Sequence, residues 1–96
     1  MDHHILISGE FENLEAREIL LSLIDSKIKF HNLKNFSHEE RFGIKDKEST
    51  KRLTELKELR AEILRFLENN EDSDFVYKIS SAISIEMVPK KMPAKI

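Results

Sequence analysis

The segment spanning residues 12–34 has the spacing of a helix, but it carries apolar side chains on two opposite sides. Glu12 or Asn13 is placed to cap this helix. At about 100° per residue, one side collects Leu14, Leu21, Ile24, Ile28 and His31, with Leu20 at its edge, and the other side collects Ile19, Leu23 and Phe30. A surface helix of a small monomer needs only one apolar stripe. We therefore expect this helix either to lie between a sheet and a second helix or to form a subunit contact.

A second helical segment follows, and its apolar residues form a single stripe. Asp46 is placed to cap its first turn, and the stripe ends near Glu68. The stripe comprises Leu53, Leu56, Leu59, Ile63 and Leu67, flanked by Phe66. Between the two helices, residues 35–45 lose the helical period and include serine and glycine. This segment predicts an interhelical loop.

Two segments near the ends of the chain have the character of β-strands. Residues 5–7 are a short aliphatic run followed by Ser8 and Gly9, which predicts a strand that ends in a turn. Residues 75–88 alternate with a period of two, which predicts a half-buried strand of about 13 residues, more than twice the usual five or six. The short strand cannot pair with all of the long one. We expect a second copy of the chain to pair with the unmatched half.

These four segments predict an α+β domain in the order β-α-α-β. Two strands joined by a helical hairpin are antiparallel, and a two-stranded sheet is only marginally stable by itself. We expect a long antiparallel helical hairpin that packs on a small antiparallel sheet and is completed by dimerisation. The single domain is expected to occupy residues 1–88. Residues 89–96, which contain two prolines and three lysines, are expected to form a flexible basic tail.

The composition excludes several classes of protein. The chain has 96 residues, of which 40% are hydrophobic and 35% charged, as expected for one small globular domain. Because it has no cysteine, disulfides, thiolate catalysis and Cys-based zinc sites are excluded. Two glycines are too few for a glycine-rich phosphate loop. The sequence shows neither a secretory signal nor a membrane span, so we expect a cytoplasmic protein with no membrane partner.

Residues 31–43 hold the highest density of reactive side chains in the sequence. A histidine oriented by a carboxylate can act as a general base. The candidates for a small enzyme are His31, His38, Glu39, Glu40 and Arg41. However, adjacent residues rarely face each other, and the sequence contains neither a nucleophile elbow nor a His-Glu-x-x-His pair. We therefore favour a structural loop over a catalytic site, and no cofactor is expected.

Charge alternates along the chain in four blocks, negative, positive, negative and positive. The basic block at residues 27–52 includes interleaved phenylalanines, a composition typical of weak RNA or single-strand binding. The candidate nucleic-acid ligands are Lys27, Lys34, Arg41, Lys45, Lys51 and Arg52. A basic edge that docks on the acidic helix surface of a second subunit explains the pattern at least as well, and we favour it.

The third residue, His3, belongs to a familiar metal-binding arrangement. A free amino group, two deprotonated amides and an imidazole at position three offer four nitrogens in a plane, which suits Cu(II) or Ni(II). Any chain with a free N-terminus and histidine at this position has the same capacity. We therefore expect incidental metal binding and no functional metal site.

The sequence favours a non-enzymatic interaction or structural module that self-associates as a homodimer or higher homo-oligomer. The interface candidates are Ile19, Leu23, Phe30, Ile83 and Ile85. The alternatives are binding of RNA or single-stranded nucleic acid through residues 27–52, and a small enzyme with its site at the interhelical loop. An unidentified protein partner is a further alternative to a second copy of the chain.

Overall fold

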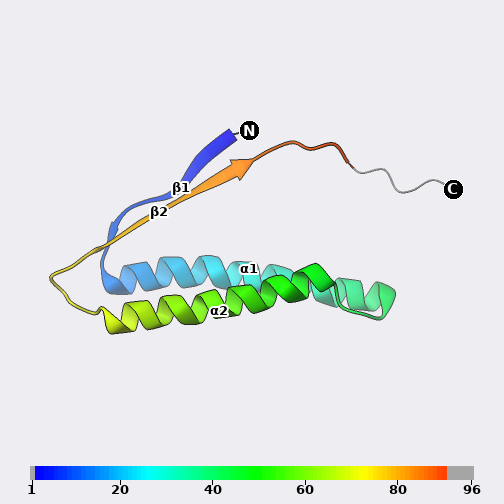
Figure 1. Cartoon of the computed structure of the whole chain (residues 1–96), viewed down its shortest axis with the longest axis horizontal. Coiled ribbons are helices and arrows are strands. Elements are labelled where there is room, and N and C mark those ends of the chain that lie inside the picture. Colours follow the sequence, from blue (N-terminus) through cyan, green and yellow to red (C-terminus); the bar gives the residue numbers. More distant parts are fainter. Residues whose placement is uncertain (1, 91–96) are drawn as a thin grey trace.

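The computed structural model describes residues 2–90, without the side chains of Asp2 and His3. The elements are β1 (Asp2–Phe11), α1 (Asn13–Phe42), α2 (Lys47–Asn69) and β2 (Tyr77–Ile85). The predicted α+β class and the order β-α-α-β are confirmed. Figure 1 shows the two helices side by side as an antiparallel hairpin, with both strands leaving from the end where α1 begins and α2 ends. We call this the corner end of the hairpin, and the opposite end its loop end.

α1 begins directly after β1. Glu12 is its N-cap, and the backbone N–H of Glu12 donates a hydrogen bond to Oε1 of Glu15 at 3.0 Å, as in a capping box. The predicted cap at this position is therefore confirmed. Because only Glu12 separates Phe11 of β1 from Asn13 of α1, the strand and the helix are joined without a flexible linker.

α1 continues to Phe42, whereas the sequence pattern predicts its end near Lys34. Gly43 ends the helix with φ of 77°, a left-handed conformation that costs glycine little, and its N–H donates to the carbonyl oxygen of Glu39 at 2.8 Å. The predicted loop over residues 35–45 is therefore wrong. Residues 35–42 contain no proline or glycine to stop the helix, and the connection consists of residues 43–46 alone.

α2 begins where its capping residue predicts. The Oδ2 atom of Asp46 accepts a hydrogen bond from the backbone N–H of Ser49 at 2.9 Å, which confirms Asp46 as the N-cap. The helix ends at Asn69, one residue beyond the predicted end at Glu68.

β1 and β2 pair along their whole length in an antiparallel ladder that runs from Phe11 opposite Tyr77 to Asp2 opposite Ile85, with a bulge at Leu6. We call this pair the β-ribbon. β1 is longer than the predicted strand over residues 5–7, so β2 has no unmatched half. The argument for a dimer from unequal strand lengths is therefore wrong. Ser8 and Gly9, which predict a turn, instead lie within β1, opposite Ser80 and Ile79.

The two helices pack along a line of buried side chains, which we call the helix seam. Its buried members are Ser49, Leu53, Leu56 and Leu67 on α2, and Ala16, Ile24 and Asn35 on α1. Ser49, Leu53 and Leu56 are separated by four and three residues, as in a coiled coil. Leu14, expected on the buried side of α1, is instead exposed.

The described residues bury little apolar surface. Five hydrophobic residues in residues 2–90 are buried, and 17 large hydrophobic residues are exposed. The Cα radius of gyration is 17.8 Å, against roughly 12–13 Å for a compact domain of this length. None of the described helices combines the length and the apolar character needed to cross a membrane.

Candidate functional site

The strands and helices meet at a corner that Asn13 holds together. Its Nδ2 atom donates hydrogen bonds to the carbonyl oxygen of Leu67 in α2 and to the hydroxyl of Tyr77 in β2, both at 3.0 Å. The ring of Phe66 packs edge-on against Tyr77, with 6.2 Å between centroids. These contacts join three elements and fix the position at which the β-ribbon leaves the helices.

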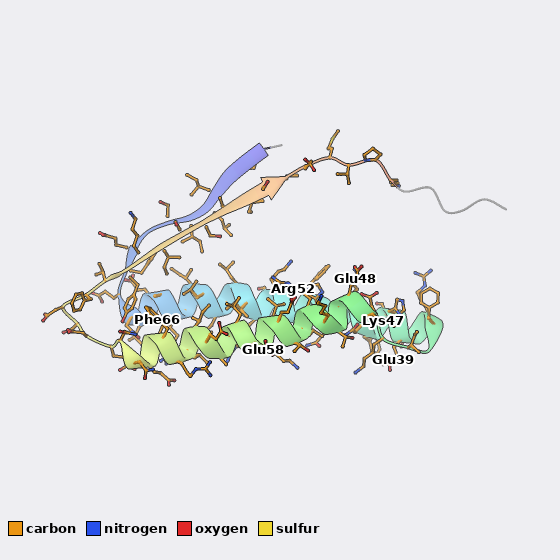
Figure 2. The ribbon with its side chains drawn as sticks, viewed as in Figure 1. Glu39, Lys47, Glu48, Arg52, Glu58 and Phe66 are labelled. Carbon is orange, nitrogen blue, oxygen red and sulfur yellow. The ribbon has the colours of Figure 1, made fainter. Side chains whose placement is uncertain are left out.

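An apolar cleft of about 450 Å³ opens beside this corner, between the helices and β2. Its walls include Ala16 and Leu20 of α1, Ile63 and Phe66 of α2, and Ile79 of β2. Figure 2 shows Phe66 at this end of the hairpin, and Figures 1 and 2 show the ribbon diverging from the helices toward the loop end. The backbones of the ribbon and the helices therefore separate beyond the cleft.

Exposed apolar side chains continue both walls of the cleft. On the ribbon these are Ile83 and Ile85, which alternate with polar neighbours on the same face as Tyr77. On the helices these are Leu23 and Phe30, which follow Ala16 at seven-residue intervals, and Leu59, seven residues before Phe66. We call the cleft with these extended walls the open cleft. Of the predicted interface residues it contains Leu23, Phe30, Ile83 and Ile85, and Ile19 lies half-buried on the same side of α1.

His31 and His38 make contacts that join α1 to the residues after it. Nδ1 of His31 lies 3.2 Å from Oγ of Ser49, which is only 1% exposed and so out of reach of a substrate. Nδ1 of His38 lies 2.7 Å from the carbonyl oxygen of Ile44, and because a carbonyl only accepts, this nitrogen carries the proton. Both contacts connect segments of the hairpin.

The other catalytic candidates do not gather around these histidines. Glu39, Glu40 and Arg41 are exposed in the last turns of α1. The carbonyl oxygen of Glu39 is occupied by the cap at Gly43. The structure therefore assembles no acid–base pair from these residues.

Sequence reasoning missed Asn35, which closes the loop end of the hairpin. This buried side chain accepts a hydrogen bond from the backbone N–H of Asp46 at 3.1 Å and donates to Oγ1 of Thr50 at 3.3 Å. The available signal was its position four residues after His31, on the same side of the helix. A helical pattern defined by apolar residues alone does not include an asparagine, even when its side chain is buried.

Two carboxylates have pKa values below their ordinary range. Hydrogen bonds from the backbone and side chain of Ser49 lower the pKa of Asp46. A hydrogen bond from Arg60, with Nε to Oδ1 at 2.8 Å, lowers the pKa of Asp25 and raises that of Arg60. The first pair caps α2, and the second links α1 to α2 across an exposed edge of the helix seam.

The predicted nucleic-acid ligands fall into two groups. Lys27, Lys34 and Arg41 recur every seven residues and so share one side of α1. The ammonium of Lys27 lies 5.4 Å from the ring centroid of Phe30. The remaining candidates are Lys45 in the loop and Lys51 and Arg52 in the first turns of α2. Arg52 forms an ion pair with Glu55 at 3.3 Å.

Metal binding has no support in the part of the chain that the structure describes. Within it, no three histidine, aspartate or glutamate side chains are grouped to hold a metal ion. The side chain of His3 and residues 91–96 of the predicted basic tail lie outside the described parts.

Comparison of the chain with protein-family models, with curated proteins and with solved structures gives no match. The function is therefore inferred from the residues of this chain alone.

Proposed function

We propose that the chain is a non-enzymatic interaction module that works by self-association, as a homodimer or a higher homo-oligomer. The observation that carries this proposal is the open cleft, where exposed aliphatic and aromatic side chains line both walls beside a fixed corner. Monomeric proteins rarely expose continuous apolar patches larger than a few hundred Å². Covering such surface stabilises an assembly by roughly 25 cal/mol per Å² of apolar area.

The roles of the polar groups agree with this proposal. His31 and Asn35 make hydrogen bonds from α1 to α2, and His38 contacts the loop between them, so all three side chains hold the hairpin together. Satisfied polar contacts of this kind specify how packed elements align. For the catalytic alternative, Glu39 lines a cavity of about 310 Å³ together with Lys45 and Thr50, but neither His31 nor His38 lines it.

The experiment that tests the proposal introduces a charge into the helix wall of the open cleft. Phe30→Asp and Leu23→Asp are expected to shift the protein toward monomer in sedimentation velocity, because a buried carboxylate would be costly at an apolar interface. Leu14→Asp is the matched control, since Leu14 is exposed on another side of the same helix. The same fraction of monomer in all three variants would contradict the proposal.

A second candidate function is weak binding of RNA or single-stranded DNA, which the line of Lys27, Lys34 and Arg41 favours. Basic side chains at seven-residue intervals beside an exposed aromatic ring match the contacts that single strands use. The test is fluorescence anisotropy with labelled oligouridine at low and high salt. Charge reversal at Lys34 should weaken binding more than reversal at Lys29, which points to another side of α1. No binding at low salt would eliminate this candidate.

A further inference from the structure

The apolar face of the β-ribbon becomes uncovered as the ribbon leaves the helices. Tyr77 and Ile79 are half-buried beside the corner, whereas Ile83 is 40% exposed, Ile85 55% and Met87 95%. The opposite face is polar beside the corner, with Ser8 opposite Ser80 and Glu10 opposite Lys78, and farther out it carries Ile5 opposite Ala82. The ribbon is therefore amphipathic beside the corner, and only its first part is covered by its own chain.

The ribbon is not free to close on its own helices. A single residue, Glu12, separates β1 from α1, and Asn13 ties the start of α1 to Leu67 and Tyr77. Closing the ribbon would require these two hydrogen bonds to break or the strand to bend sharply. Covering the exposed walls of the open cleft therefore requires a second molecule.

Charge is segregated along the hairpin in a way that the sequence alone does not reveal. The antiparallel topology brings two acidic segments, residues 12–26 and 53–74, to the corner end and leaves the basic block, residues 27–52, at the loop end. Figure 1 shows the turn between α1 and α2 at the opposite end from the point where the strands leave. Two copies therefore attract each other most strongly when the loop end of one lies against the corner end of the other.

We propose that the open cleft receives the basic loop end of the helical hairpin of a second copy, and that two copies insert into each other with their hairpins antiparallel. This inference rests on the proposed self-association and adds its geometry. The helix walls with Leu23, Phe30 and Leu59 pack against the same residues of the second copy. Each ribbon, through Ile83 and Ile85, covers the hairpin inserted beneath it. A two-fold axis relates the copies and closes the assembly as a dimer.

The apolar area is close to what such a dimer needs. The exposed residues on the walls are Leu23, Phe30, Leu59, Phe66, Ile83 and Ile85, about half exposed on average. At roughly 150 Å² each, the lower limit for an aromatic side chain, they present on the order of 400 Å² of apolar area. A standard interface buries about 800 Å² per partner, of which somewhat more than half is apolar.

The first test measures which ends of the two copies are close. Because the chain has no cysteine, Lys45→Cys at the loop end and Glu71→Cys beyond α2 accept dyes at single positions. A 30-residue helix is about 45 Å long, so energy transfer separates the two arrangements. We expect strong transfer from donor-labelled Lys45→Cys to acceptor-labelled Glu71→Cys copies. Weak transfer is expected when both dyes are on Lys45→Cys.

In a dimer, strong transfer between two Lys45→Cys copies and weak transfer from Lys45→Cys to Glu71→Cys would overturn the antiparallel arrangement and leave self-association intact. A dimer with no transfer in either mixture would also overturn it. A monomeric mass together with no transfer would overturn both the inference and the proposed function.

The second test concerns the ribbon and the charge pattern. Ile85→Asp is expected to raise the dimer dissociation constant about tenfold or more, whereas Ser80→Asp, on the polar face of the same ribbon, leaves it within about threefold. The wild-type dimer is also expected to weaken with added salt, because opposite charges lie across the interface. A dimer that strengthens with salt, or equal effects of the two substitutions, would contradict the arrangement.

Discussion

The side-chain amide of Asn13 donates to the hydroxyl of Tyr77 at 3.0 Å and, through the same nitrogen, to the carbonyl oxygen of Leu67 at 3.0 Å. One residue at the start of α1 thereby holds the end of α2 and the start of β2. The sheet and the helices have little other contact, so this corner determines the direction in which the ribbon leaves. The open cleft exists because that direction is fixed.

Removing the amide should loosen the corner. Asn13→Ala is expected to lower the free energy of unfolding by about 1–3 kcal/mol, because it deletes two partly buried hydrogen bonds. Asn32→Ala is the matched control, since Asn32 is exposed on the same helix. Urea unfolding followed by circular dichroism measures both variants. Equal stability of the two would show that Asn13 does not hold the corner.

The helix seam and the open cleft should respond differently to the same substitution. Replacing Leu56, which is 3% exposed in the helix seam, with alanine should lower the free energy of unfolding by about 2–5 kcal/mol. The same replacement at Leu59, which is on the same helix and 40% exposed, should lower the free energy of unfolding of the single chain by roughly 1 kcal/mol or less. Leu59→Ala should instead raise the dissociation constant of the dimer. Urea unfolding at several protein concentrations separates the two effects, and equal losses at every concentration would contradict this assignment.

Stability should fall in acid because of Asp25 and Asp46. The pKa of each is lower in the folded chain than its ordinary value, since Arg60 and Ser49 donate hydrogen bonds to the charged carboxylates. The carboxylates of Asp25 and Asp46 therefore bind protons more tightly in the unfolded chain than in the folded chain. The stabilisation is present above the ordinary carboxyl pKa of about 4 and is lost as the pH falls below it.

Thermal unfolding between pH 7 and pH 3 measures this dependence. Asp46→Asn and Asp25→Asn should each flatten the decline below about pH 4. Asp74→Asn, in the turn before β2, is the control and should change the decline less. A wild-type stability that does not change through this range would contradict the role of both carboxylates.

Much of the fold follows from periodicity in the sequence. The order of the elements and the caps at Glu12 and Asp46 are local features, set by side chains that reach their own backbone neighbours. The end of α1 is predicted wrongly because residues 35–42 are polar apart from Phe36 and Phe42, a composition that resembles a loop but does not prevent a helix. Gly43, in a left-handed conformation, was the better signal for its end.

Long-range relationships could not be predicted in the same way. Ser8 and Gly9 predict a turn, and only their pairing with Ser80 and Ile79 shows that they belong to a strand. The hydrogen bonds of Asn13 likewise join residues more than 50 positions apart. The exposed apolar residues Leu23, Phe30, Ile83 and Ile85 are interface candidates from pattern alone, and only the fold shows that they continue the lines of side chains that begin at the cleft.

The molar mass in solution tests the central claim most directly. Light scattering over a dilution series, at low and high salt, compares the mass with the 11.3 kDa of one chain. We expect twice that value at micromolar concentration and low salt, with dissociation on dilution and at high salt. A mass of one chain at tens of micromolar under both conditions would contradict self-association and leave the open cleft without the partner proposed for it.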